Sequence, residues 1–224
     1  MFNEWLWGGF AIVNFAMILA IYKIFGKPGL FVWIGMSTVV ANIQVLKTVE
    51  LFGITATLGN IIYGTAFLAT DILNEKYGKK DAKKAVWLGF FTLIAMTVMM
   101  QIALQFTPAE SDTVQGSLVT LFSLVPKVAL GSLAAYLISQ YFDVWIFSKL
   151  KSKFPDDKYL WLRNNGSTMI SQLLDSAVFC TIAFSGMPLN IWLEIFISTY
   201  VIKFIVSFLD TPFFYIAKKM KTTN

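Results

Sequence analysis

Polar residues recur at helical spacing within residues 163–185, a segment otherwise rich in apolar side chains. Positions separated by four, three and four places share one face of a helix. Four polar residues have this spacing: Asn164, Thr168, Ser171 and Asp175. Gln172 lies on the adjoining stripe. Amides, hydroxyls and a carboxylate on one face can bind a polar ligand through hydrogen bonds, so we predict that this helix faces something other than lipid.

Two further apolar segments carry polar residues at the same spacing. The stripe within residues 191–217 consists of Thr199, Lys203, Ser207 and Asp210. The stripe within residues 117–147 consists of Ser132, Tyr136, Ser139 and Asp143. An apolar helix with a polar stripe turns that stripe away from lipid, so three such helices indicate a shared polar interior.

Asp175, Lys203 and Asn42 are predicted to lie at similar depth near the centre of the membrane, where a pocket would bind its ligand. At about 1.5 Å per residue from the predicted cytoplasmic ends of their segments, they lie ~18, ~21 and ~18 Å inside. An unpaired charge there costs ~2.5 to 3.5 kcal/mol. Either Asp175 and Lys203 neutralise each other as a structural pair, or they line a pocket for a flat, polar ligand. The polar side chains beside them favour the pocket: Gln172, Ser171, Asn164 and Asn42.

Charged residues also lie closer to the ends of the apolar segments. Asp71 and Glu75 are four positions apart at the predicted cytoplasmic end of residues 57–74. Acids near an interface are common where lysines are close by, so position alone assigns them no function. Lys127 follows Pro126 about a third of the way into residues 117–147. Its long side chain either extends to the interface or lines an entrance.

The elements that must position these residues are membrane-spanning helices. Hydrophobic residues make up 57% of the 224 positions and charged residues 14%, with a mean hydropathy of +0.66. This composition lies outside the range of soluble domains. Crossing a hydrocarbon core of ~30 Å takes about 20 residues. We predict seven such segments: residues 5–25, 31–50, 57–74, 85–106, 117–147, 163–185 and 191–217.

Lysine and arginine gather in alternate connections. Residues 76–84, 149–163 and 218–221 hold most of them, whereas residues 52–59, 107–116 and 185–190 hold none. The positive-inside rule makes the basic connections and the C-terminus cytoplasmic. Seven spans then put the N-terminus outside. The net charge of +5 is accounted for by these connections and does not indicate nucleic-acid binding.

Several function classes are excluded by residue types. The chain has one cysteine and no histidine, which rules out internal disulfides, thiolate or imidazole metal sites and histidine-bound haem. It lacks the G-x-x-x-x-G-K-[ST] motif of ATPases, and no cofactor is expected. An intramembrane enzyme is disfavoured, because Asp143 and Asp175 lack the glycine motif of an aspartyl protease. A structural or assembly protein of the membrane stays an alternative.

Four stretches together resemble the queuosine precursor transporter family: residues 69–82 (ATDILNEKYGKKDA), 132–151, 167–184 and 203–212. This family is also described as vitamin uptake transporters and is similar to the substrate-binding subunits of energy-coupling-factor importers. The resemblance covers roughly residues 31–217. It implies an all-α integral membrane protein with a six-helix transporter domain over residues 31–217. Residues 1–30 would add an N-terminal transmembrane helix and a short link, and residues 218–224 a cytoplasmic basic tail.

The resemblance implies a multi-pass inner-membrane importer of 7-deazaguanines, the cyano or aminomethyl precursors salvaged for tRNA modification. The positions that match the family are Asn42, Asp71, Glu75, Gln140, Asp143, Ser167, Gln172, Asp175, Lys203 and Pro212. We expect the substrate to be bound by Asp175, Lys203, Gln172, Asn42, Asn164, Ser171 and Thr168. Asp175 would accept from the donor edge of the base, Lys203 or an amide would donate to its carbonyl, and an aromatic ring would stack on it.

A gate or coupling role is expected for a second group: Asp71, Glu75, Asp143, Gln140 and Lys127. The energy source stays open. Either the chain carries out facilitated or ion-coupled transport, as a monomer or a homodimer, or it works with a separate ATPase module. In the second case the ligand could be another nucleobase or a vitamin.

Overall fold

The computed structural model describes residues 2–186 and 188–222 and is predominantly helical. Its elements, in chain order, are α1 (Phe2–Gln44), β1 (Thr48–Leu51), β2 (Ile54–Thr57), α2 (Asn60–Tyr77), α3 (Lys79–Ala103), α4 (Gln115–Phe122), α5 (Val125–Lys153), a short 3₁₀ helix (Asp157–Tyr159), α6 (Leu160–Ala183) and α7 (Leu189–Lys219). The predicted helical membrane-protein fold is confirmed at this level.

The element α1 consists of two helices that meet at Gly26. This residue has φ 58° and ψ −138°, a non-helical conformation that glycine adopts at little cost. The chain reverses tightly here, because a Cβ atom at Gly29 would lie 2.6 Å from the Ile21 carbonyl oxygen. The predicted segments 5–25 and 31–50 therefore begin as two separate helices. The prediction that the second continues to residue 50 is wrong, since helix ends at Gln44.

A small antiparallel hairpin follows α1 and was not expected from the sequence. β1 pairs with β2 in the register Thr48↔Thr57 to Leu51↔Ile54. The turn uses Phe52 and Gly53, both with positive φ. The pairing satisfies backbone groups of residues predicted to be helical, and it brings Thr57 to the end of the bundle where α2 begins.

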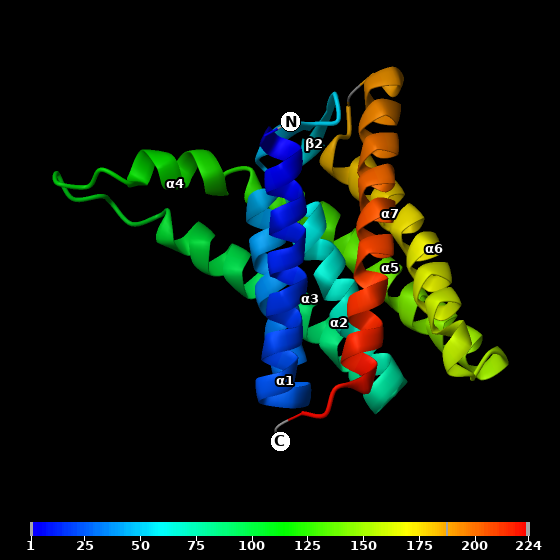
Figure 1. Ribbon diagram of the computed structural model, residues 1–224. Coiled ribbons are helices and arrows are strands. Elements are labelled where there is room, and N and C mark those ends of the chain that lie inside the picture. The colour runs from blue at the N-terminus through cyan, green and yellow to red at the C-terminus, as the bar shows by residue number, and fades with distance from the viewer. Residues whose placement is uncertain (1, 187, 223–224) are drawn as a thin grey trace.

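The helix α2 lies at the centre of the bundle (Figure 1). Every residue from Asn60 to Asn74 is buried. Close packing against α7 needs a small side chain, because a Cβ atom at Gly64 would lie 2.5 Å from Cγ1 of Val206. Trp33 of α1 donates a hydrogen bond of 3.0 Å to the Thr65 hydroxyl, which joins α1 to α2. The polar residues of α2 are therefore surrounded by protein.

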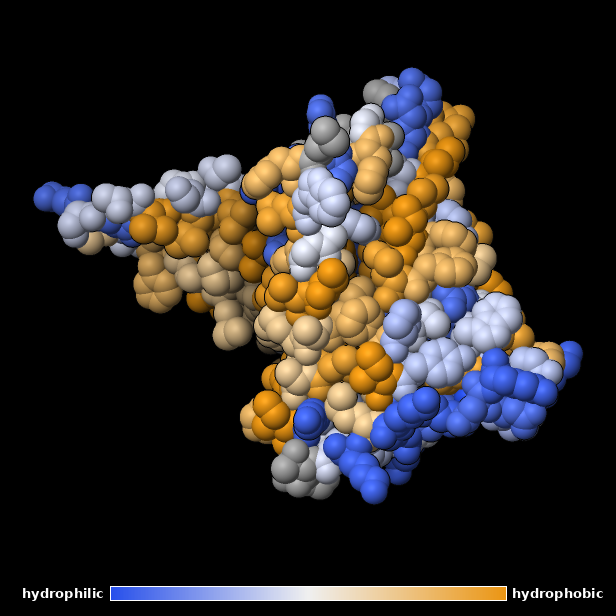
Figure 2. All heavy atoms as spheres, in the orientation of Figure 1, coloured by the Kyte–Doolittle hydropathy of each residue, from blue (hydrophilic) through white to orange (hydrophobic). Residues whose placement is uncertain are grey.

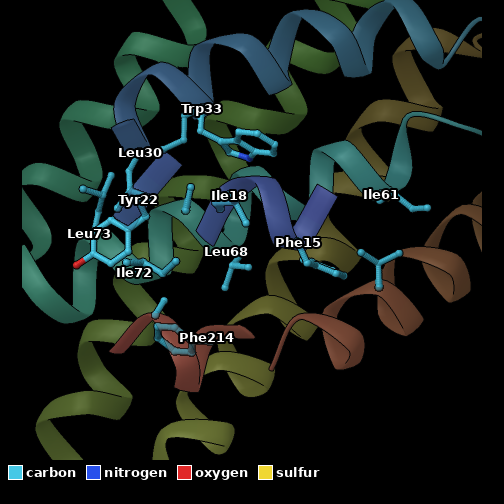
Figure 3. Close-up of a cluster of buried hydrophobic side chains, with 14 of the residues drawn as sticks. Phe15, Ile18, Tyr22, Leu30, Trp33, Ile61, Leu68, Ile72, Leu73 and Phe214 are labelled. Carbon is cyan, nitrogen blue, oxygen red and sulfur yellow. The ribbon is translucent and has the colours of Figure 1, made fainter. Parts of the chain in front are cut away.

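The N-terminal half of α1 is part of the same core (Figure 3). Phe15, Ile18 and Tyr22 lie beside side chains of α2 and α7 in one buried cluster. Phe15 stacks on Phe213 of α7 with ring centroids 4.6 Å apart. The expected additional N-terminal helix thus packs directly on the helices of residues 31–217. The division of the chain into units at residues 30 and 217 stays a prediction.

The predicted segment 117–147 is divided between two helices. α4 ends at Phe122 and α5 begins at Val125, with Pro126 in its first turn, where the missing N–H costs nothing. α4 and the adjoining ends of α3 and α5 project from the bundle as an arm, at the left of Figure 1. Lys127 is exposed at the start of α5.

Four stretches of the described chain are long and apolar enough to cross a membrane: residues 2–44, 79–103, 115–153 and 192–219. The protein is therefore a membrane protein with several spans. Figure 2 shows apolar surface between two hydrophilic ends on the face in view. The N- and C-termini lie at opposite ends of the bundle (Figure 1), as an odd number of crossings requires. Seven spans and their orientation stay a prediction.

Candidate functional site

A buried ion pair joins α6 to α7 in the half of the bundle nearer the hairpin. Asp175 is 1% exposed and Lys203 6%. The Lys203 ammonium donates to Oδ2 of Asp175. Oδ1 of the same carboxylate accepts from the Tyr63 hydroxyl of α2 at 2.6 Å and from the Ser139 hydroxyl of α5 at 3.0 Å. Three helices thus donate to one buried carboxylate, which offsets part of its desolvation cost.

Two aromatic rings flank the ammonium group of Lys203. Its Nζ lies 4.9 Å from the ring centroid of Tyr63 and 6.0 Å from that of Phe179. Cations at such distances are attracted by the ring faces. The lysine is therefore held by a carboxylate and two aromatic rings.

A cavity of about 40 Å³ lies beside the ion pair. Its wall combines α1, the end of the hairpin, α2, α5, α6 and α7. Its polar members are Asn42, Thr57, Asn60, Tyr63, Ser132, Asp175, Thr199 and Lys203. The Asn42 amide donates to the Thr38 carbonyl at 2.8 Å, while its Oδ1 has no hydrogen-bond partner among the described residues. An amide oxygen on this wall is thus available to a ligand.

The size of the cavity decides what it can hold in this conformation. About 40 Å³ accommodates a few water molecules. Pockets for small organic ligands measure about 300–1,000 Å³, so a two-ring base needs the surrounding side chains to move apart. The sequence offered two interpretations of Asp175 and Lys203, a structural ion pair or the wall of a ligand pocket. The structure has features of both, since the two side chains contact each other and also line a cavity.

A second buried polar group lies further along the bundle, towards the C-terminal ends of α2, α5 and α7. It contains the carboxylates of Asp71, Asp143 and Asp210, all buried. Asp71 lies against Asp143 and also faces Asp210. The Asn164 amide of α6 donates to Asp210 at 2.8 Å. We call these three carboxylates the acid cluster.

Two reciprocal hydrogen bonds connect the ion pair with the acid cluster. Ser139 of α5 donates to Asp175 of α6, while Ser171 of α6 donates to Asp143 of α5 at 2.8 Å. In each helix the serine and the aspartate are four positions apart, which is about 6 Å along the axis. The antiparallel helices α5 and α6 therefore place one carboxylate of each group a single helical turn apart.

Glu75 lies at the end of α2 in a network of basic side chains. It contacts Lys151 of α5 at 3.2 Å, Arg163 of α6 at 3.2 Å and Lys218 of α7 at 2.7 Å. Arg163 is fully buried and also donates to the backbone carbonyl of Phe154 at 2.8 Å. One carboxylate thus ties three helices together at the end of the bundle opposite the hairpin.

The structure separates the residues predicted to bind substrate. Asn42, Asp175 and Lys203 line the cavity. The remaining four are buried on α6 outside the cavity wall: Gln172, Asn164, Ser171 and Thr168. Asn164 and Ser171 contact the acid cluster instead.

The residues predicted to gate or couple transport also lie in different parts of the structure. Asp71 and Asp143 belong to the acid cluster, and Gln140 lies one turn before Asp143 on the same buried face of α5. Glu75 lies in its own basic network. Lys127 is exposed at the start of α5 and lines no wall of the cavity beside Asp175.

Tyr63 and Phe179 were not singled out from the sequence, although both line the cavity. A signal for Tyr63 was present, because it lies eight positions before Asp71 and a helix places both on one face. Phe179 lies four positions after Asp175 and shares its face in the same way. In a chain with 21 phenylalanines and 8 tyrosines, only the fold distinguishes these two rings from those in contact with lipid.

Comparison with known proteins identifies the class. Residues 57–217 match the family described as "Putative vitamin uptake transporter". A protein of Bacillus subtilis strain 168, named "Probable queuosine precursor transporter", is 58% identical over 221 residues, which is 98% of this chain and 96% of that protein. The chain belongs to this transporter family. It is a membrane transporter and not an enzyme, as the resemblance of its motifs predicted.

Two more distant relatives carry related names. The "Queuosine precursor transporter" of Escherichia coli K12 is 26% identical over 75% of this chain and 74% of its own length. The "Probable queuosine precursor transporter" of Haemophilus influenzae Rd is 30% identical over 59% of this chain and 54% of its own length. No solved structure gives a significant match to this chain.

Proposed function

We propose that this protein imports 7-deazaguanine precursors of queuosine across the inner membrane and binds the base beside Asp175 and Lys203. The names of its relatives support the substrate class. One observation supports the location of the site. The buried Asp175 carboxylate lies on the same cavity wall as the unpartnered amide oxygen of Asn42 and the rings of Tyr63 and Phe179. These groups match the donor edge and the flat faces of a guanine-like base.

The arrangement implies an exchange of partners when the base enters. A guanine-like edge offers a ring N–H and an exocyclic amine side by side, and one carboxylate can accept both. In the closed structure Oδ2 of Asp175 accepts from Lys203. Binding therefore moves the ammonium from the carboxylate to the base carbonyl. The Tyr63 hydroxyl keeps Oδ1 of Asp175 in place while the rings of Tyr63 and Phe179 enclose the base.

The proposed orientation places this cavity in the outer half of the membrane. It has seven spans, with the N-terminus and the hairpin outside and the C-terminus in the cytoplasm, because the basic connections lie at the C-terminal end of the bundle. In this scheme Glu75 and its three basic partners form the cytoplasmic gate, which has to open for release. The base enters from the hairpin end, where Thr57 and Asn60 line the cavity.

Thermal stabilisation of the purified protein tests the binding site. We expect 7-cyano-7-deazaguanine or 7-aminomethyl-7-deazaguanine to raise the melting temperature of the wild type, because a ligand that binds only the folded state stabilises it. A panel of guanine, adenine and water-soluble vitamins separates the proposed substrate from other members of this class. If only a vitamin raised the melting temperature, that vitamin would replace the 7-deazaguanines as the proposed substrate. If no compound raised it, a structural role in the membrane would be favoured.

Counterflow of labelled precursor in liposomes tests whether the chain transports alone, as a monomer or a homodimer. We expect flux with this protein as the sole component. Binding without any flux would favour a substrate-binding subunit that depends on a separate ATPase module.

A further inference from the structure

The acid cluster brings three carboxylates together from three helices. Asp71 belongs to α2, Asp143 to α5 and Asp210 to α7, and each is at most 1% exposed. Asp71 lies against Asp143 and faces both Asp210 and Glu75. Asp143 also faces Asp210. Three helices that are far apart in sequence thus each bring a buried carboxylate to the same region of the bundle.

No base compensates these charges within residues 2–186 and 188–222. The nearest basic side chains are already paired with other acids: Lys151, Arg163 and Lys218 contact Glu75, and Lys218 also contacts Asp157. The ammonium of Lys203 is bound to Asp175 on the other side of the serine links. Neighbouring carboxylates in a low-dielectric interior cannot all be ionised, so at least one of them needs a bound cation or a proton.

The contact between two carboxylates points to a proton. Among the described residues, no group of three or more histidine, cysteine, aspartate or glutamate side chains has the spacing of a metal site, so the three carboxylates share a region without sharing one coordination point. The Asp71 and Asp143 carboxylates lie against each other, an approach that becomes attractive when one of them carries a proton and donates it to the other.

Neutral polar groups around the cluster are also unpartnered. Gln140 is fully buried one turn from Asp143, and neither atom of its amide has a hydrogen-bond partner within the described chain. The Thr168 hydroxyl is buried and faces Asp143, without a hydrogen bond of good geometry to any described residue. Buried polar groups are normally paired. We therefore expect the side chains of Gln140 and Thr168 to gain hydrogen-bond partners when the acid cluster binds or releases its ion.

We propose that Asp71, Asp143 and Asp210 form a proton-binding site, distinct from the base-binding cavity, and that its proton enters the cell together with the substrate. This inference rests on the proposed function. The link is the pair of serine bonds: Ser139 holds Asp175 in the cavity wall, and Ser171 holds Asp143 in the cluster. When a base takes Lys203 away from Asp175, the helices α5 and α6 transmit the change over one turn to Asp143.

Infrared spectroscopy of the purified protein tests the site without any substrate. We expect the wild type at neutral pH to show the band of a protonated carboxylic acid that Asp71→Asn removes, because the variant deletes the carboxyl group that lies against Asp143. Asp143→Asn gives the same test where Asp71→Asn does not fold. Asp156→Asn is the control, since that carboxylate is 66% exposed. A spectrum in which neither cluster variant loses such a band would overturn the proposal.

Liposomes with a trapped pH-sensitive dye test the coupling. In the wild type, an inward gradient of 7-cyano-7-deazaguanine should acidify the lumen. Asp71→Asn should lose this acidification, while its affinity for the base stays within about threefold because Asp71 lies outside the cavity wall. Substrate flux without proton movement in the wild type, or acidification by the variant at the wild-type rate, would overturn the coupling. Absence of substrate flux in the wild type would instead count against the proposed function, and the infrared result would still decide whether the proton site exists.

Discussion

The ion pair and the acid cluster are two buried acidic regions that the fold treats differently. Asp175 has a base, two hydroxyl donors and a cavity beside it. Asp71 has no hydrogen-bond partner among the described residues and lies against a second carboxylate. A compensated carboxylate can exchange its partner for a ligand, whereas neighbouring uncompensated carboxylates need a cation or a proton. This contrast is the reason that we propose ligand recognition for the first region and energy coupling for the second.

The largest expected effect is that of Asp175→Asn on affinity for the base, which tests the ion pair without changing the acid cluster. Asp175→Asn removes the charge that accepts the donor edge of the base and leaves Lys203 buried without its partner. We expect affinity for 7-cyano-7-deazaguanine to fall about 1,000-fold, as when a buried hydrogen-bonded charge pair is broken. Calorimetric titration measures this. The exposed Asp112→Asn is the matched control, and an affinity of Asp175→Asn equal to that of the control would remove Asp175 from the site.

A third acidic region, the network around the half-buried Glu75, sharpens the comparison because this carboxylate has more basic partners than it can neutralise. Glu75→Gln leaves the fully buried Arg163 without a carboxylate. We expect a destabilisation of about 3 kcal/mol, which lowers the melting temperature by roughly 5–10 °C in a chain of this size. Thermal unfolding in detergent measures it, with the exposed Glu110→Gln as control. Equal melting temperatures for the two variants would show that the network does not stabilise the bundle.

The hydroxyl of Tyr63 lies in the region of the ion pair, and its removal should weaken binding of the base moderately. Tyr63→Phe keeps the ring against Lys203 and deletes the hydrogen bond to Asp175. We expect about a 10- to 100-fold loss of affinity for the base, the effect of one hydrogen bond to a charged group. The same variant should leave proton movement per transported substrate unchanged. A lower proton-to-substrate ratio would contradict the separation of the two regions.

The smallest expected effect comes from the two serines that link the regions. Ser139→Ala removes one donor to Asp175, and Ser171→Ala removes one donor to Asp143. We expect Ser139→Ala to weaken binding about threefold and Ser171→Ala to leave binding unchanged while slowing gradient-driven uptake. Binding and uptake are measured on both variants. Identical behaviour of the two serine variants would show that the regions act as a single site.

Much of the fold was predictable because apolar length is a local property of the chain. α3 has large apolar residues around most of its surface, and the segment 85–106 was recognised from them. α2 and α6 are not among the four stretches that qualify as spans by length and hydropathy. Their polar residues lower the hydropathy, and these residues are buried in the bundle. The spacing of those residues, not their hydropathy, indicated that they belong to the bundle. The hairpin was missed because β1 lies at the end of the predicted segment 31–50 and most of β2 in the predicted connection 52–59, where strands of four residues are too short to give a clear pattern.

The candidate site was predictable only in part. Helical spacing places Asn164, Thr168, Ser171 and Asp175 on one face, and the structure keeps them there. Spacing within one helix cannot tell which residues of that face meet the cavity and which meet Asp143 or Asp210. That assignment depends on the antiparallel register of α5 and α6, in which residue 139 lies opposite 175 and residue 143 opposite 171.

By itself the sequence determined that this is a helical membrane protein of a transporter family with buried charges at helical spacing, because hydropathy, periodicity and motif all act along the chain. Only the tertiary structure decided that Lys203 neutralises Asp175 while Asp71, Asp143 and Asp210 have no base among the described residues. Charge compensation depends on distances between side chains of different helices, and those distances exist only once the helices have packed.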